Sequence, residues 1–367
     1  MGLSAKALDC AECSERIRGI AYALDSQDKN ASATREEERP MRAPYPNLPS
    51  YSEIMARTDG PAGSGWGVFG DDDHIGTINL LSPEAVVSAA SLVKRGATFN
   101  LDYELNAFAP PVSPYRRGIQ HTVVSRHDGQ VYDDFVSDFF LQGSSQIDGL
   151  RHHRHKIHGF YGNVPASAVE AGSPALGVQH IAQKGIAGRG VLLDVQRYLE
   201  EQGRPLDLAT NSVIALSDLE GAAEAQGISF ERGDILLLHT GWARHFLNDL
   251  TTEDRAWIIK ERTFCGVEQS REMLAWIWDN HFSVLASDTV VVEVMPSIPT
   301  SPFETNVGRL MHPDLIALLG VCLGEMWKLD ELAADCARDG VYEFLLTAKP
   351  LNLVGGVGSP PNALAIK

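Results

Sequence analysis

The stretch QGSSQIDGLRHHRHKIH, residues 142–158, has the densest set of side chains in the sequence that could bind a metal or transfer a proton. It places four of the chain's 12 histidines, His152, His153, His155 and His158, within about ten residues of Asp148. Carboxylate oxygens and imidazole nitrogens together suit Mn²⁺ or Zn²⁺. The stretch could be a metal site, a proton-transfer site or a solvated basic turn.

The residues before these histidines predict a strand that runs into a loop. Side chains two positions apart share one face of a strand, so Gln142, Ser144, Gln146 and Asp148 are predicted to point together into a cavity. His152 follows one short loop later. For the other three histidines we favour exposure on a polar loop, beside the basic residues Arg151, Arg154 and Lys156.

Composition limits the class of protein. The formal net charge of −17 argues against a nucleic-acid partner, whose phosphates would be repelled. The sequence contains no run of 18 apolar residues, so it predicts no membrane-spanning helix. Five cysteines, sparse and odd in number, favour a reducing compartment, and we expect a cytoplasmic protein. The C-x-x-C pair, Cys10 and Cys13, is interpreted as free thiols in a tail.

The first 50 residues predict an extension to one large domain. Residues 1–40 are polar, and we expect a short helix and a disordered linker there. RAPYPNLPSY, residues 42–51, predicts an extended arm that lies on the domain or on a partner subunit, because prolines are excluded from the middle of a sheet. Residues 51–367 are predicted to form a single domain. The arm favours a homo-oligomer, a dimer or tetramer with twofold symmetry.

Hydrophobic patterns from residue 82 onwards predict an α/β layered fold with a mixed sheet. Strands alternate with helices along most of the chain, but the early strands lack helices between them. Helices are predicted at residues 82–96, 217–227, 266–281 and 311–320, and strands at 97–106, 190–195, 233–242 and 282–289.

Several blocks in this order resemble the cyclase family of metal-dependent hydrolases, which includes bacterial-type kynurenine formamidase and isatin hydrolase. The family's metal motif is H-x-G-T-H-x-D, with a further histidine four residues after the aspartate. Asp148 and His152 match it, whereas Gln142 and Gln146 replace its two histidines. The resemblance covers roughly residues 55–367, and the other matching blocks are GWGVFGDDDHIGTINLLSPEAV from residue 65, GDILLLHTGW from 233, MHPDLIALLGVCLGEMWKLDEL from 311 and PLNLVGGVGSPPNALAI from 350.

A second stretch, HIGTIN from His74, superficially spells the same motif. Ile78 stands where the second histidine should be, and Asn79 does not have the spacing of the aspartate. We therefore interpret this stretch as a loop in which Asp72, Asp73 and Asn79 form turns.

The resemblance implies a swivelling β/β/α fold and a divalent ion held by Asp148, His312 and Glu325, with Gln146 and His152 as further candidate ligands. Because a glutamine can bind a metal only through its neutral carbonyl oxygen, the two replacements imply one ion rather than two. The oxygen-rich ligand set favours Mn²⁺, and Zn²⁺ stays open. His152 is the expected acid/base, and Glu325 is a ligand or a second catalytic base.

The implied activity is hydrolysis of an amide, a formamide, or a cyclic amide or lactone of a small molecule by a metal-activated water. Two alternatives are a family member that binds a small molecule without turnover and a cyclase or dehydratase acting on a polyketide-like carbonyl compound. The candidate substrate-binding residues are aromatic side chains in or beside the matching blocks, namely Trp66, Phe69, Phe160, Tyr161 and Trp242.

Overall fold

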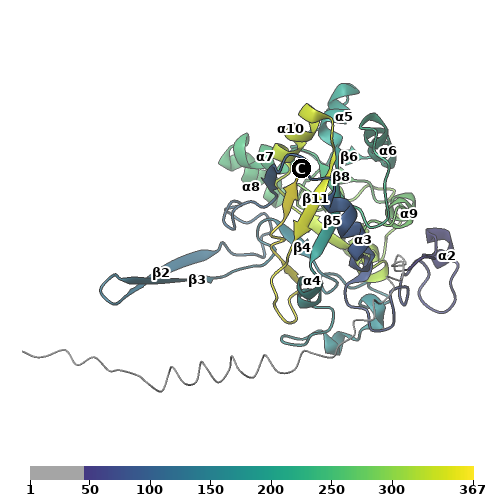
Figure 1. Cartoon of the computed structure of the whole chain (residues 1–367), viewed down its shortest axis with the longest axis horizontal. Helices are drawn as coiled ribbons and strands as arrows, with labels where there is room; N and C mark the ends of the chain where they lie inside the picture. Colours follow the sequence, from purple (N-terminus) through teal and green to yellow (C-terminus); the bar gives the residue numbers. More distant parts are fainter. Residues whose placement is uncertain (1–44) are drawn as a thin grey trace, which may run out of the picture. The chain divides into compact units, whose positions relative to one another are not determined.

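The computed structural model describes residues 45–367, and its central element is a nine-stranded mixed sheet (Figure 1). The strand order is β1-β13-β11-β5-β7-β9-β10-β4-β12. These strands are β1 (Thr98–Asn100), β4 (Gln146–Asp148), β5 (Ile186–Asp194), β7 (Ile235–His239), β9 (Val284–Ser287), β10 (Cys322–Glu325), β11 (Glu343–Ala348), β12 (Gly358–Ser359) and β13 (Leu364–Ile366). The predicted α/β fold with a mixed sheet is confirmed, whereas the expected helix, linker and Cys10/Cys13 pair lie outside the described residues.

Four parallel strands, β5, β7, β9 and β10, form the centre of the sheet, and antiparallel strands flank them on both sides. Every residue of β7 and β9 is buried, as their continuous apolar sequences predict for strands covered on both faces. Figure 1 shows α3 across the sheet, where it packs on β5 and β11.

Helices connect most of the central strands. The α-helices are α2 (Tyr51–Met55), α3 (Pro83–Ala90), α4 (Val178–Lys184), α5 (Val195–Glu201), α6 (Leu216–Ala225), α7 (Trp242–Asn248), α8 (Thr252–Glu261), α9 (Arg271–Asp279) and α10 (Asp330–Asp339). Short 3-10 helices lie at η1 (Gly76–Leu80), η2 (Tyr161–Asn163), η3 (Ala166–Ala168) and η4 (Val307–Arg309), and a π-helix at η5 (Asp314–Leu318). No helix in residues 45–367 is both long enough and apolar enough to cross a bilayer.

The predicted helix boundaries hold best where a capping side chain sets them. Ser82 accepts a hydrogen bond from the Ala85 amide and starts α3, as expected, but α3 ends at Ala90 rather than Gly96. Helix α9 starts only after its cap, Ser270, because Gly266–Val267 form strand β8, which pairs with β6 (Val213–Ile214).

The described part of the proline-rich arm lies on its own chain. The Trp278 indole nitrogen donates to the Pro49 carbonyl over 2.7 Å, and Arg232 donates to the Tyr45 carbonyl over the same distance. Trp278 is itself buried, and Trp276 packs against the same core. The sequence predicted that this arm lies either on its own domain or on a partner subunit. Residues 45–50 lie on the surface of their own domain.

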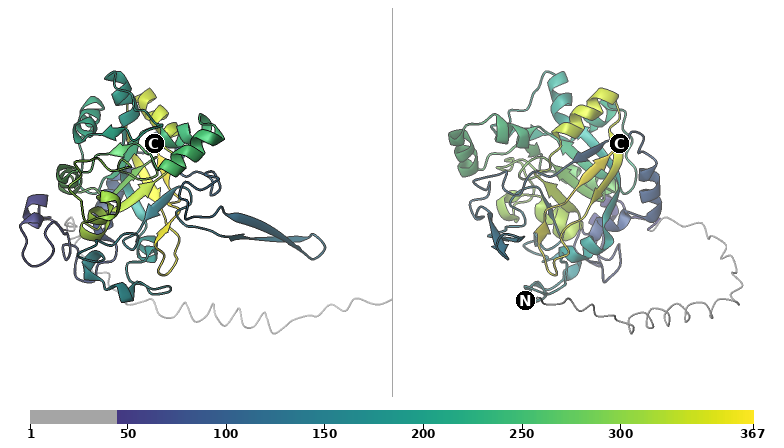
Figure 2. Two further views of the ribbon diagram at one scale, coloured as in Figure 1. Left: turned by 180° about the vertical axis from the view of Figure 1, so that it is seen from behind. Right: turned by 60° about the vertical axis from the view of Figure 1, so that its left-hand side comes forward.

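A β-hairpin stands apart from the sheet. Strands β2 (Gln120–Arg126) and β3 (Val131–Ser137) pair only with each other and project away from the nine-stranded sheet, as Figure 1 and the left view of Figure 2 show. The alternation of the sequence did not lead us to expect this hairpin.

The HIGTIN stretch forms η1, and its glycine is needed for packing. Gly76 has a φ of +57°, and a Cβ atom there would lie 1.9 Å from the Gly320 carbonyl oxygen. Asp73 accepts hydrogen bonds from the Gly76 amide and the Asn79 side chain, which confirms the turn interpretation. The stretch is a structural contact with the segment that precedes β10.

Replacing Gly76 by alanine is expected to lower the free energy of unfolding by about 1–3 kcal/mol, through backbone strain and the clash with Gly320. Gly96→Ala is the matched control, because Gly96 also has a positive φ, +66°, but nothing within 4 Å of its Cβ position. Urea denaturation should show the larger loss for Gly76→Ala. Equal losses would mean that the close approach to Gly320 contributes nothing.

Candidate metal centre

Two neighbouring strands bring the carboxylates of the site together. Strand β4 lies between β10 and β12, with Asp148 opposite Leu323 and Gln146 opposite Glu325. Only residues 146–148 are extended, and residues 142–145 form a turn, so the predicted longer strand is wrong. Gln142 nevertheless reaches Asp148, because the turn folds back over β4.

Asp148, His312 and Glu325 form the one cluster of potential metal ligands found in residues 45–367. One ligand atom from each lies within 4.8 Å of the others, and all three side chains are buried. His312 lies just before η5, and Glu325 ends β10. Two buried carboxylates in one place are costly unless positive charge compensates them, so the cluster is suited to a cation.

The two glutamines hold one oxygen of each carboxylate. The amide nitrogen of Gln142 donates to Asp148 Oδ1 over 2.6 Å, and that of Gln146 donates to Glu325 Oε2. Asp148 Oδ2 is buried and has no hydrogen-bond partner, while Glu325 Oε1 lies 3.0 Å from His312 Nε2. One oxygen of each carboxylate and one imidazole nitrogen are thus left for an ion, which fits a single divalent cation.

Gln146 therefore does not direct its side-chain carbonyl oxygen at the three ligand atoms of the cluster. Its Oε1 faces the Arg116 guanidinium, at 3.4 Å, and its amide nitrogen faces Glu325. The structure places Gln146 as a hydrogen-bond donor that orients Glu325, rather than as the ligand that the sequence suggested.

Glu293 orients His312 and was missed in the sequence. Its carboxylate lies 2.5 Å from His312 Nδ1 and accepts hydrogen bonds from the amides of Met311 and His312. A carboxylate behind a histidine fixes the ring so that the other nitrogen faces a metal. The only signal in the sequence was an acid inside an apolar run, VVVEV.

Electrostatics in the cluster follow from burial and close pairing. Burial alone lowers the pKa of His312, but its hydrogen bonds to Glu293 and Glu325 outweigh burial and raise the pKa to about 10. Burial and the nearby Asp148 carboxylate raise the pKa of Glu325 to about 7. An ion bound by His312 Nε2 would displace the proton through which this nitrogen pairs with Glu325 Oε1.

Glu293→Gln is expected to weaken divalent-ion binding about 10- to 100-fold, because partners of ligating histidines typically contribute that much. Competition with a chromophoric chelator measures the affinity. Glu343→Gln is the control. Glu343 on β11 pairs with Arg189 on β5, outside the cluster. An unchanged affinity in Glu293→Gln would show that His312 does not need this partner to bind the ion.

His152 lies beside the free oxygen of Asp148. Its Nε2 is 3.5 Å from Asp148 Oδ2, and its Nδ1 is 2.7 Å from the Gln142 amide nitrogen. Burial lowers the pKa of His152 despite the Asp148 carboxylate, which favours the neutral ring. Nε2 is the ring atom that faces the cluster.

The predicted exposure of the other three histidines is wrong. His155 is buried, and His153 and His158 are half-buried. His153 packs edge-on against His152 and His312, and burial with these two neighbours lowers its pKa to about 2. The chain turns back on itself through paired backbone bonds between His155 and Gly159, which folds these rings inward. Arg151 is also buried, with its guanidinium donating to backbone carbonyls such as that of Ser173.

A cavity of about 660 Å³ opens beside the cluster. It is lined by His152, His153, Arg154, Lys156, Glu304, Thr305, Asn306, Val307 and Pro313. The five aromatic residues predicted to bind substrate do not line it. Trp242 is fully buried and stacks on Phe246, Phe69 is buried in the main core, and Phe160 packs against that core.

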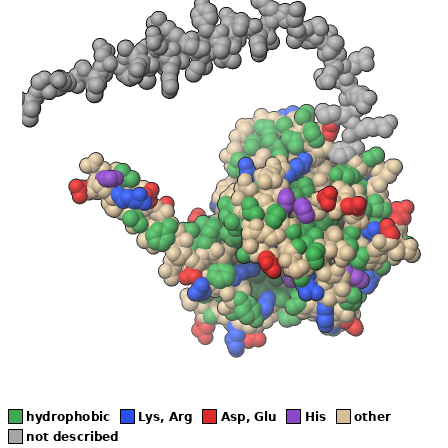
Figure 3. Space-filling view, turned by 90° about the horizontal axis from the view of Figure 1, so that it is seen from below, with side chains coloured by type: hydrophobic (Ala, Val, Ile, Leu, Met, Phe, Trp, Pro, Cys, Tyr) green, Lys and Arg blue, Asp and Glu red, His purple; other side chains and the backbone are tan. Residues whose placement is uncertain are grey.

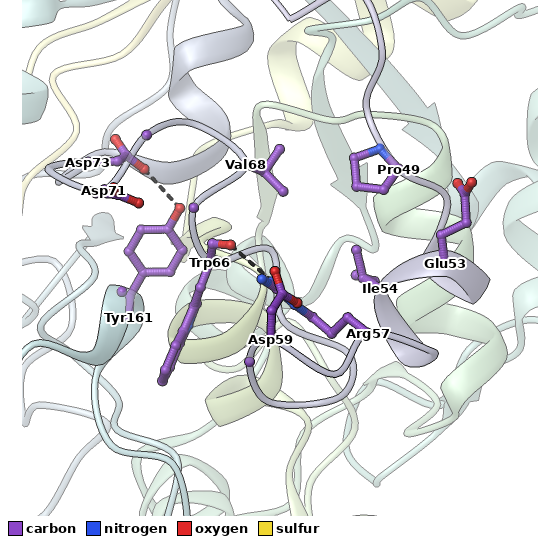
Figure 4. Close-up of a pocket in the computed structure, with 14 residues that line it drawn as sticks. Pro49, Glu53, Ile54, Arg57, Asp59, Trp66, Val68, Asp71, Asp73 and Tyr161 are labelled. Carbon is purple, nitrogen blue, oxygen red and sulfur yellow. Dashed lines mark hydrogen bonds and ion pairs between the residues drawn. The ribbon is translucent and has the colours of Figure 1, made fainter.

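Trp66 and Tyr161 line a different cavity, of about 650 Å³ (Figure 4). The Tyr161 hydroxyl donates to Asp73 over 2.8 Å, and the Trp66 indole nitrogen donates to the Ala317 carbonyl over 2.7 Å. Both polar atoms are thus engaged with the protein. Proximity in sequence to the motif thus did not place these rings in the cavity beside the ligand cluster, and their binding of substrate stays a prediction.

Comparison with known proteins agrees with this architecture. A solved structure described as a novel cyclase is 33% identical, with a TM-score of 0.72, and the match covers 83% of this chain and 99% of that chain. Isatin hydrolase A from Ralstonia solanacearum shares the fold at 16% identity and a TM-score of 0.51, over 78% of this chain and 98% of that one. No curated protein matches the chain. The family model described as Putative cyclase matches residues 98–294, and the chain belongs to this family.

Proposed function

We propose that the chain is a hydrolase that uses one divalent ion, Mn²⁺ or Zn²⁺, to cleave an amide, formamide, or cyclic amide or lactone bond of a small molecule. The observation that carries this proposal is the unpartnered, buried Asp148 Oδ2 next to His312 Nε2 and Glu325 Oε1. These three atoms would hold the ion. The oxygen-rich set favours Mn²⁺.

A divalent ion at this position supplies Lewis acidity, because it lowers the pKa of water and polarises a carbonyl group. The protein supplies the geometry. Gln142 and Gln146 fix the two carboxylates, and Glu293 fixes the His312 ring. The cavity beside His152 and His153 is the space for the substrate.

We assign proton transfer to His152. A neutral imidazole can accept a proton, and Nε2 of His152 faces the cluster. Hydrolysis adds the hydroxyl of water to the carbonyl carbon and a proton to the leaving nitrogen or oxygen. His152 would take that proton from the attacking water and return it to the leaving nitrogen or oxygen.

Metal content and substrate screening test the proposal together. The purified protein should contain about one divalent ion per chain, and chelation should abolish a hydrolytic activity that Mn²⁺ or Zn²⁺ restores. The substrate panel should contain an N-formyl arylamine, a cyclic amide, a lactone and a β-hydroxy carbonyl compound. A protein without metal and without turnover of any of these would be a binding member of the family. Turnover of the β-hydroxy carbonyl compound alone would indicate a dehydratase.

A further inference from the structure

The cavity beside the metal cluster carries more positive than negative side chains. One segment supplies Arg154 and Lys156, and another supplies Glu304, which is the one carboxylate among the residues that line the cavity. The whole chain has the opposite balance, with 31 lysines and arginines against 48 acidic residues. Two cations against one carboxylate in a strongly acidic chain therefore favour an anion at this position.

Neither of these two cations is used by the fold. His155, which lies between them in the chain, is 3.9 Å from Asp314. Arg154 and Lys156, in contrast, form no ion pair with any carboxylate in residues 45–367, including Glu304 of the same cavity, and both side chains are exposed. Their charges are thus available to a bound molecule.

The turn that carries both cations is fixed by the residue between them. His155 is buried, and its Nδ1 accepts hydrogen bonds from the amides of Ile157 and His158 over 3.3 and 3.2 Å. Its backbone pairs with that of Gly159 in both directions. Because His155 points into the protein, its two neighbours project outward from a backbone that is already ordered, which lowers the entropic cost of binding through them.

One carboxylate ties both walls of the cavity to the metal cluster. Asp314, in η5, lies 3.9 Å from His155 on one wall and accepts a hydrogen bond from Asn306 on the other wall over 2.6 Å. The candidate ligand His312 precedes Asp314 by two residues. The two cations and the candidate ion position are therefore held in one fixed arrangement, so they can bind two parts of the same molecule.

The basic side chains do not form a broad surface on the face of the molecule in Figure 3, where they are mixed with acidic ones. Salt screens charges that lie more than about 8 Å apart at physiological ionic strength, so two cations act mainly on a group that enters the cavity. The cavity volume of about 660 Å³ suits a small molecule. The expected ligand is thus a small anion rather than a polyanion.

We propose that the substrate carries a carboxylate at a distance from the bond that is cleaved, and that Arg154 and Lys156 bind this carboxylate in the cavity. This inference rests on the proposed function, since it takes the cavity as the space for the substrate. A guanidinium can bind a carboxylate through two parallel hydrogen bonds, and an ammonium group adds a point charge. The substrate class is thereby narrowed to small acids that also contain an amide, formamide or lactone bond.

The double substitution Arg154→Gln with Lys156→Gln tests the carboxylate contact. The probes are N-formyl-4-aminobenzoate and formanilide, which share a formamide bond and differ by one carboxylate. Two exposed ion pairs together contribute about tenfold to binding. The ratio of kcat/KM for the carboxylate compound to that for formanilide should therefore fall about tenfold, mostly through KM. In the unaltered protein, added NaCl should raise KM for the carboxylate compound more than for formanilide.

Lys94→Gln with Arg262→Gln is the matched control. Both residues are exposed cations outside the cavity, so the control removes the same net charge from the chain. It should keep the preference for the carboxylate compound. An equal loss in the control would show that the overall charge, and not the cavity, sets the preference, and would overturn the proposal. Melting temperatures of both double variants separate lost recognition from misfolding.

Calorimetric titration of the same two compounds makes the test independent of turnover. In the His152→Ala background, where hydrolysis is expected to be slow, N-formyl-4-aminobenzoate should bind about tenfold more tightly than formanilide, and the two glutamine substitutions should remove this difference. Equal or undetectable affinities, or a difference that survives both substitutions, overturn the proposal, even if formanilide is hydrolysed and the proposed function stands. Carboxylate-dependent binding to a protein that hydrolyses no compound of the panel would overturn the proposed function and keep this contact.

Discussion

Replacing Asp148 by alanine is expected to leave the protein without its divalent ion and without hydrolytic activity. Asp148 Oδ2 is the only cluster oxygen that is buried and unpartnered, and its loss removes both a ligand and a negative charge. Residues that merely support a ligand contribute about 10- to 100-fold in affinity, so loss of a ligand should cost more than about 100-fold. Elemental analysis after dialysis, followed by titration with the ion, measures both quantities.

Asp218→Asn is the matched control for this variant. Asp218 is also a buried carboxylate, but it lies in α6 and pairs with Arg204. It should retain the full complement of metal even if it is less stable. Full metal content in Asp148→Ala would remove Asp148 from the ligand set and, with it, the basis of the proposed function.

His152→Ala is expected to keep the ion and lose turnover by about 10²–10⁴-fold, the usual contribution of a general acid or base. The ring contacts Asp148 from outside the three-atom cluster, so its removal should leave the affinity for the ion nearly unchanged. The kcat value for the best compound in the panel, measured with excess ion, reports the loss.

His153→Ala separates proton transfer from a change in cavity shape. His153 lines the same cavity but does not face Asp148 as His152 does. Its replacement should therefore alter KM more than kcat. If His152→Ala loses the ion together with activity, His152 is a ligand, and Glu325 becomes the candidate base.

Much of the fold could be predicted because local patterns decide it. The apolar runs of β7 and β9 and the cap of α3 at Ser82 are properties of a few adjacent residues. The hairpin was missed because its polar and apolar residues are mixed on both faces. Such a pattern does not indicate a strand that packs on its own core.

The site was only partly predictable, because its geometry depends on distant segments. The resemblance named Asp148, His312 and Glu325, which the structure brings together. Glu293 could not be found from spacing, since only the path of the chain after β9 brings it to His312. The inward position of His153 and His155 likewise depends on a turn that closes at Gly159.

The pairing of β4 with later strands also fixes the order of events during synthesis. Gln146 contacts Glu325 across 179 residues of sequence, and both neighbours of β4, β10 and β12, are translated after it. At about 5–20 residues per second, the ribosome therefore adds β4 roughly 10–40 seconds before Glu325. Asp148 has no partner ligands during that interval. An ion bound at this cluster would consequently be held only after almost the whole chain has been made, and β4 lacks both neighbouring strands until then.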